Sequence, residues 1–119
     1  MQPAAFETTD QLVARIEELL RKQEFQAAAD LYGRIQEDVG YLLMEHASVN
    51  EGLMKALANM FFRARDYYKA AMACEGINEY EKAAALYARC DAFEMAAEMY
   101  AQVGKHAEAA VMFERFGDN

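Results

Sequence analysis

Proline, tryptophan and glycine are scarce in this sequence of 119 residues, which has one proline, no tryptophan and six glycines. The only proline is Pro3, so no helix interior further along the chain is interrupted by this residue. Alanine, glutamate, methionine, leucine and lysine are abundant, and no segment has the pattern of a strand. The composition therefore predicts an all-α protein with one core.

Long apolar runs and basic clusters are also missing. No run approaches the roughly 18 apolar residues of a membrane-spanning helix, and residues 1–10 are too polar for a signal peptide. Twenty acidic and 12 basic residues give a net charge of -8, which disfavours nucleic acid as a partner. The two cysteines, Cys74 and Cys90, lie on apolar helical stripes and predict small packed side chains in a reducing compartment. We therefore expect a cytoplasmic protein without a membrane or nucleic-acid partner.

A 13-residue pattern occurs four times from Asp66 onward, as DYYKAAMACEGIN, EYEKAAALYARCD, AFEMAAEMYAQVG and KHAEAAVMFERFG. Offsets of three and four residues place its key positions on one helical face. These positions hold an aromatic residue or His (Tyr67, Tyr80, Phe93, His106), Ala (Ala70, Ala83, Ala96, Ala109), a larger residue or Cys (Cys74, Tyr87, Tyr100, Phe113) and an apolar residue (Ile77, Cys90, Val103, Phe116). Each unit therefore predicts one short amphipathic helix.

Tight turns are expected between these helices. Residues that tolerate positive φ follow each stripe: Gly76 with Asn78, Asp91, Gly104 and Gly117. A helix of about 11 residues is only about 16 Å long and is marginally stable alone in water. Each unit must therefore pack on its neighbours, which predicts a row of stacked helices.

The spacing resembles that of tetratricopeptide repeats. Met54, Leu57, Ala58 and Phe61 match the first helix of such a repeat, and the Tyr67 unit matches the second. The resemblance implies a right-handed α-solenoid of antiparallel helix hairpins, with about seven to eight helices here. The repeat advances by 26 residues instead of the family's 34, and in this the units also resemble the shorter hairpins of clathrin-heavy-chain-like or attachment-protein-like solenoids.

The first half of the chain extends the same organisation. We expect a flexible leader at 1–8 and a single domain at 9–119, with hairpins at about 9–37, 49–77 and 79–103. Thr8 with Gln11, and Ser48 with Glu51, form candidate capping boxes at two helix starts. Residues 36–47 break the rhythm and predict either a linker or a short extra helix.

The last predicted helix, at 106–116, has no partner helix. It is either a natural cap or the point at which a longer solenoid is cut, and its apolar outer face then favours self-association. This homo-oligomeric alternative stays open at the level of sequence.

Catalytic chemistry has little support in the sequence. His106 replaces an aromatic residue on a packing stripe, and His46 has no spaced ligands that would form a metal site. No glycine-rich phosphate loop is present. We therefore expect no enzyme activity, no metal and no cofactor.

A partner-binding surface is the better hypothesis. Lys55, Asn59 and Arg63 recur at intervals of four on the 49–64 helix, which the resemblance makes an inner, groove-lining helix. The next inner helix supplies Lys82 and Arg89. In the tetratricopeptide family such residues hold a peptide carboxylate, although the third inner helix here brings Glu108 instead of another base. A solvated helix face is the plainer interpretation of the same spacing.

Two functions follow from this sequence. The first is a non-enzymatic adaptor or scaffold that binds a peptide or protein partner through a concave groove with six predicted binding residues: Lys55, Asn59, Phe62, Arg63, Lys82 and Arg89. The second is a structural segment that assembles through its exposed ends.

Overall fold

The computed structural model describes residues 7–118, and all the regular secondary structure in that range is α-helical. Its eight helices are α1 (Thr9–Arg21), α2 (Phe25–Arg34), α3 (Gly40–His46), α4 (Glu51–Arg63), α5 (Tyr67–Gly76), α6 (Tyr80–Arg89), α7 (Phe93–Gln102) and α8 (His106–Gly117). The all-helical prediction is therefore confirmed for the described residues.

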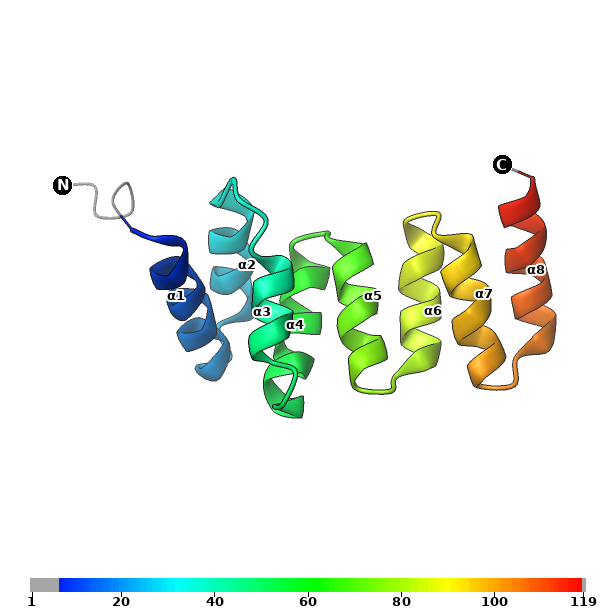
Figure 1. Cartoon of the computed structure of the whole chain (residues 1–119), viewed down its shortest axis with the longest axis horizontal. Coiled ribbons are helices and arrows are strands. Elements are labelled where there is room, and N and C mark those ends of the chain that lie inside the picture. Colours follow the sequence, from blue (N-terminus) through cyan, green and yellow to red (C-terminus); the bar gives the residue numbers. More distant parts are fainter. Residues whose placement is uncertain (1–6, 119) are drawn as a thin grey trace.

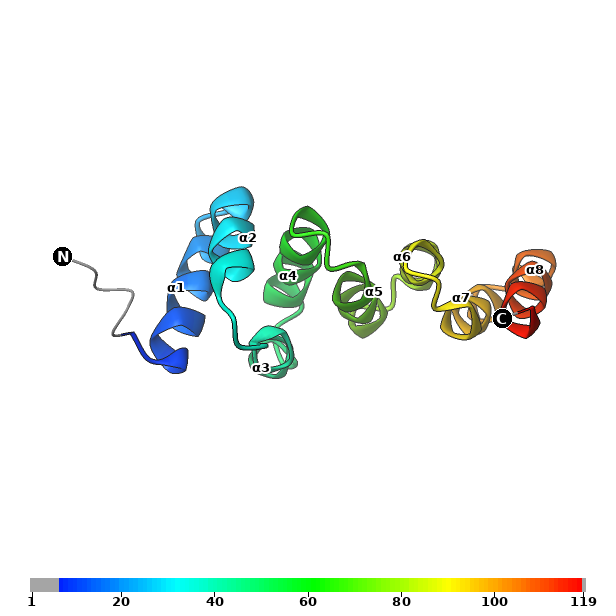
Figure 2. The ribbon, with the colours of Figure 1, turned by 90° about the horizontal axis from the view of Figure 1, so that it is seen from above.

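The helices form one elongated row that runs from α1 to α8 (Figure 1). From α5 to α7 each helix packs on the helices directly before and after it, whereas α4 packs on α1 and α2 as well as on α5. Seen from above, α4 and α6 lie on one side of the row and α5 and α7 on the other (Figure 2). Side chains of α4, α5 and α6 line the groove that forms the candidate site.

The first helix begins as the sequence predicts. Thr8 and Gln11 form a complete capping box at the start of α1. Glu7, which was expected in the flexible leader, pairs with Arg15 of α1. The rest of that leader, residues 1–6, lies outside the described part of the chain.

The capping box predicted at Ser48 and Glu51 is wrong. The N-cap of α4 is Asn50, whose Oδ1 accepts a hydrogen bond of 3.0 Å from the backbone N–H of Leu53. Ser48 instead donates to the carbonyl of Glu45, at the end of α3. Asparagine is as good an N-cap residue as serine, so the sequence alone did not distinguish Ser48 from Asn50 as the cap of α4.

The turns after α4, α5, α6 and α7 share one conformation. Arg65, Asn78, Asp91 and Gly104, which are spaced 13 residues apart, all have φ between 62° and 77°. The N–H that follows each of them bonds back to a carbonyl five residues earlier, as in Glu79 to Cys74 at 2.9 Å. This is the arrangement of a Schellman helix end. Gly76 and Gly117, which were also expected at turns, lie within their helices.

Alanine makes the close packing of the row possible. Ala70, Ala83 and Ala96 are completely buried, and Ala109 is 5% exposed. Beside them, Tyr87 is fully buried and its hydroxyl donates a hydrogen bond of 2.9 Å to Glu75. Small methyl groups at the crossing points let the helix axes approach while the larger rings fill the remaining space.

The two cysteines differ in environment. Cys74 is buried as predicted, and burial raises the pKa of its thiol. Cys90 is exposed, which corrects the prediction that it packs as a small apolar residue. It follows the end of α6, where its Sγ lies 3.4 Å from the carbonyl of Tyr87.

Residues 36–47, which do not follow the repeat pattern, contain the short helix α3. Its buried side is formed by Val39, Leu43 and Ala47. Lys69 of α5 holds the start of this segment, because its Nζ lies 3.4 Å from Asp38 Oδ1 and 3.3 Å from Asp66 Oδ2. Burial lowers the pKa of Lys69, but the two carboxylates outweigh burial and raise it. The extra helix is thereby fastened to the repeat region.

No helix in residues 7–118 has the length and apolar character needed to cross a membrane.

Candidate functional site: a groove between two helices

A groove of about 510 Å³ lies between α4 and α6. Its floor and walls are mostly apolar and include Cys74 and Ile77, from α5 and its C-terminal cap, and Leu86 of α6. Polar side chains occupy the edges. We call this the α4–α6 groove, and its lining residues are Lys55, Ala58, Asn59, Phe62, Cys74, Ile77, Glu79, Lys82, Ala85 and Leu86.

Four of the six predicted binding residues meet in this groove: Lys55, Asn59, Phe62 and Lys82. They come from two helices separated in sequence by α5. The Lys82 ammonium lies 3.3 Å from Glu79 Oε1, so its charge is partly compensated at the surface. Within residues 7–118, no ion pair or hydrogen bond engages the Lys55 ammonium, which leaves it available to an acidic group of a ligand.

Phe62 is 47% exposed although it is a large apolar side chain. Its ring packs edge-on against Tyr67 with centroids 5.7 Å apart. Exposed aromatic side chains that are held in place by neighbours are frequent anchors of protein interfaces. Phe62 therefore gives the groove a rigid apolar wall.

The two predicted arginines lie outside the lining of this groove. The Arg89 guanidinium stacks on the ring of Tyr67 at 4.3 Å and lies 5.8 Å from the Phe62 ring, so it contacts the aromatic pair that forms the wall. Arg63 donates to Asn59 Oδ1 at 2.8 Å and lines a different depression near Asp30 and Arg34.

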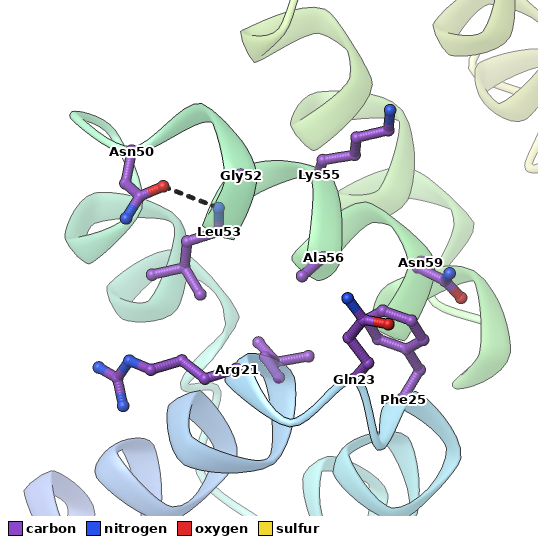
Figure 3. Close-up of a pocket in the computed structure, with 10 residues that line it drawn as sticks. Arg21, Gln23, Phe25, Asn50, Gly52, Leu53, Lys55, Ala56 and Asn59 are labelled. Carbon is purple, nitrogen blue, oxygen red and sulfur yellow. Dashed lines mark hydrogen bonds between the residues drawn. The ribbon is translucent and has the colours of Figure 1, made fainter.

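A second depression of about 480 Å³ lies on the other side of α4 (Figure 3). The turn between α1 and α2 forms its opposite wall with Gln23 and Phe25, and Leu53 and Ala56 contribute from α4. Lys55 and Asn59 line both depressions, and in Figure 3 the Lys55 side chain points away from Phe25. These two residues thus form a polar ridge between two hollows.

Sequence reasoning missed the floor of the α4–α6 groove. Cys74 and Ile77 were assigned to a packing stripe, and Ala58, Ala85 and Leu86 were not singled out for the site. One signal was present: the apolar set of α4 is too wide for a single stripe and predicts coverage on two sides. In the structure, Leu57 and Phe61 are buried, whereas Ala58 and Phe62, on another side of α4, line the groove.

The histidines do not join a cluster of catalytic type in the described part of the chain. The Nδ1 of His46 lies 2.9 Å from Glu17 Oε2, which links α3 to α1 at the surface. His106 is exposed at the start of α8. Residues 7–118 contain no group of three His, Cys, Asp or Glu side chains placed to hold a metal ion.

Comparisons with protein-family models, with curated proteins and with solved structures found no significant match to this chain. The function must therefore be argued from the groove itself.

Proposed function

We propose that this chain is a non-enzymatic protein interaction module of the cytoplasm that binds a peptide or a segment of a partner protein in the α4–α6 groove. The observation that supports the proposal is the meeting of Lys55, Asn59, Phe62 and Lys82 from two helices around an apolar floor. We further infer that the helices form a right-handed α-solenoid of antiparallel hairpins similar to tetratricopeptide repeats.

The groove favours a particular kind of partner segment. An apolar side chain fits against Cys74, Ile77 and Leu86, and a carboxylate of the same segment lies within reach of the Lys55 ammonium. The local positive charge contrasts with the net charge of -8 for the whole chain. Acidic partners are therefore steered to this groove and repelled elsewhere.

The test starts from a display library of random peptides panned against the 119-residue chain. Selected peptides are synthesised and their affinities are measured by isothermal titration calorimetry. We expect the selected peptides to combine apolar and acidic residues. Because an attractive contact becomes repulsive, Lys55→Glu should weaken their binding by about tenfold or more.

Two matched controls separate the groove from general charge effects. Lys22→Glu makes the same charge change at an exposed lysine at the end of α1. Ala85→Asp places a carboxylate in the groove, while Ala101→Asp places one at an exposed alanine of α7 outside its lining. Peptides that bind Lys55→Glu and Ala85→Asp as tightly as the unmodified chain would rule out this groove as the binding site.

A further inference from the structure

The last helix of the row has an apolar face that its predecessors keep covered. Ala71, Ala84 and Ala97 occupy the same position of successive units and are all 0% exposed. Ala110, the next residue in this series, is exposed. Similarly, Tyr87 is fully buried and Tyr100 is partly buried, while their counterpart Phe113 is 48% exposed. We call the exposed set His106, Ala110, Phe113 and Gly117 the end face of α8; Gly117 lies at its rim, where the equivalent residues Asn78, Asp91 and Gly104 are also exposed.

The burial in earlier units identifies what kind of surface fits this end face. On α5, α6 and α7, each of which packs against a following helix, the equivalent alanine is buried, whereas on α8, the last described helix, it is exposed. We infer that the following helix covers this position. That following helix always carries the same pattern of alanines and large apolar side chains. The end face of α8 is therefore shaped to receive another helix of this pattern.

We propose that a second copy of this chain covers the end face, through a two-fold pairing of α8 with α8. In an antiparallel pair centred on the middle of the helix, between Val111 and Met112, Ala110 of each copy faces Phe113 of the other. His106 faces Gly117 in the same way. Each large side chain thus meets a small one, which is the combination that the row itself uses. None of these four side chains carries a fixed charge that the pairing would bury.

The opposite end of the row argues for a closed dimer over a filament. The exposed side chains of α1 are mostly polar and include Asp10, Gln11, Arg15 and Glu18. Among the exposed residues of α1 only Ala14 is apolar, so this surface offers no large exposed apolar side chain to match Phe113. A head-to-tail contact of α8 on α1 is therefore disfavoured, and a two-fold contact of α8 with itself closes at two copies.

Sedimentation equilibrium of the 119-residue chain tests the proposal, over concentrations up to about 1 mM because a single helix pair makes a small interface. We expect the mean mass to rise from 13.5 kDa toward twice that value and to stop there. A constant mass of one chain overturns the proposal. So does a mass that continues to rise beyond the dimer, because it indicates an open contact.

Two exposed residues of α8 provide a matched pair of variants. Phe113 and Val111 are both 48% exposed, but Val111 lies on the side of the helix away from the end face. Phe113→Glu should raise the dimer dissociation constant by tenfold or more, because it places a charge in the contact. Val111→Glu should change it by less than about threefold. Equal effects of the two variants overturn the proposed face.

A fluorescence measurement detects burial of the end face directly, without a variant that weakens the dimer. The chain has no tryptophan, so Phe113→Trp introduces a single reporter. Its emission should shift to shorter wavelength as concentration rises, whereas that of Val111→Trp should not. Circular dichroism of every variant establishes that the helices are intact. A synthetic helix of the repeat pattern that binds Phe113→Trp while the chain stays monomeric would assign the end face to a different partner and overturn the second copy.

Discussion

The hydroxyl of Tyr32 donates a hydrogen bond of 2.8 Å to Oδ2 of Asp66, which lies 34 positions further along the chain. Asp66 is the N-cap of α5, and its Oδ1 accepts from the N–H of Lys69. The Tyr32 ring also packs edge-on against Phe61, with centroids 5.3 Å apart. One carboxylate thus joins α2 to the start of α5 at the place where the extra helix α3 interrupts the repeat.

Removal of this bond should reduce stability measurably. We expect Tyr32→Phe to lower the free energy of unfolding by about 1–2 kcal/mol, because the bond is partly buried and involves a charged acceptor. Asp66→Ala should lower it by about 2–3 kcal/mol, since the helix cap is lost as well. Urea denaturation of the two single variants and the double variant gives the coupling between the residues. Tyr80→Phe is the control, because the Tyr80 hydroxyl bonds only to nearby Asn78 at the surface and should contribute less than about 0.5 kcal/mol.

Two tyrosines should make the fold sensitive to alkaline pH. Burial, followed by the hydrogen bonds to Asp66 and Glu75, raises the pKa of Tyr32 and Tyr87 far above its usual value. In the unfolded chain these hydroxyls ionise near pH 10, while in the folded chain they keep their protons. Their contribution to stability is therefore complete below about pH 10 and decreases as the pH rises above it.

The measurement is the urea midpoint as a function of pH. The unmodified chain should lose stability above about pH 10, and Tyr32→Phe and Tyr87→Phe should each lose it less steeply because one ionising group has been removed. If the double variant declines as steeply as the unmodified chain, these two hydroxyls are not the groups responsible.

Two glycines should respond in opposite directions to the same substitution. A Cβ added at Gly40 would lie 2.4 Å from Lys69 Cδ and 2.9 Å from the Tyr32 hydroxyl, so Gly40→Ala must displace the side chain that holds α3. We expect a loss of about 1–3 kcal/mol in the free energy of unfolding. Gly33 lies in α2 and an added Cβ meets nothing within 4 Å. Gly33→Ala should therefore stabilise the protein by about 0.5–1 kcal/mol. Thermal or urea unfolding distinguishes these signs, and a neutral Gly40→Ala would mean that Lys69 is free to move aside.

The regular part of the fold was predictable because each 13-residue unit contains the residues that define both a helix and the turn after it. The spacing of alanines and aromatic residues sets the buried face, and Asn78, Asp91 and Gly104 mark the turns. Arg65 adopts the same backbone conformation without any such signal in its residue type. There the return bond from Asp66 to the carbonyl of Phe61 and the packing of the adjoining helices impose the turn. The contact of Lys69 with Asp38 was also unpredictable, since it depends on how a separate helix docks.

The site was predictable only in part, for a geometric reason. Successive residues rotate by about 100° around a helix, so Asn59 lies about 40° from Lys55 and Arg63 about 80° from it. The interval of four therefore places Lys55 and Asn59 in the α4–α6 groove but carries Arg63 away from it. Phe62, seven residues after Lys55, returns to within about 20° and lines the groove. The floor at Cys74 and Ile77 comes from α5, and only the packing of three helices reveals it.

The repeated turns allow a final prediction: introducing a glycine at Arg65 should stabilise one turn, and replacing Gly104 should weaken another. Arg65 has φ of 62°, a conformation that disfavours most side chains by about 1–2 kcal/mol. Arg65→Gly removes this strain but increases the freedom of the unfolded chain by about 0.5–1 kcal/mol, so we expect a net gain of up to about 1 kcal/mol. Gly104 has φ of 77° with open space around it, and Gly104→Ala should therefore lose about 1 kcal/mol through the backbone alone. Urea unfolding of both variants and of their combination provides the measurement, and the two effects should add because the sites lie in different turns. A destabilising Arg65→Gly would show that contacts of the arginine side chain outweigh the strain of its backbone.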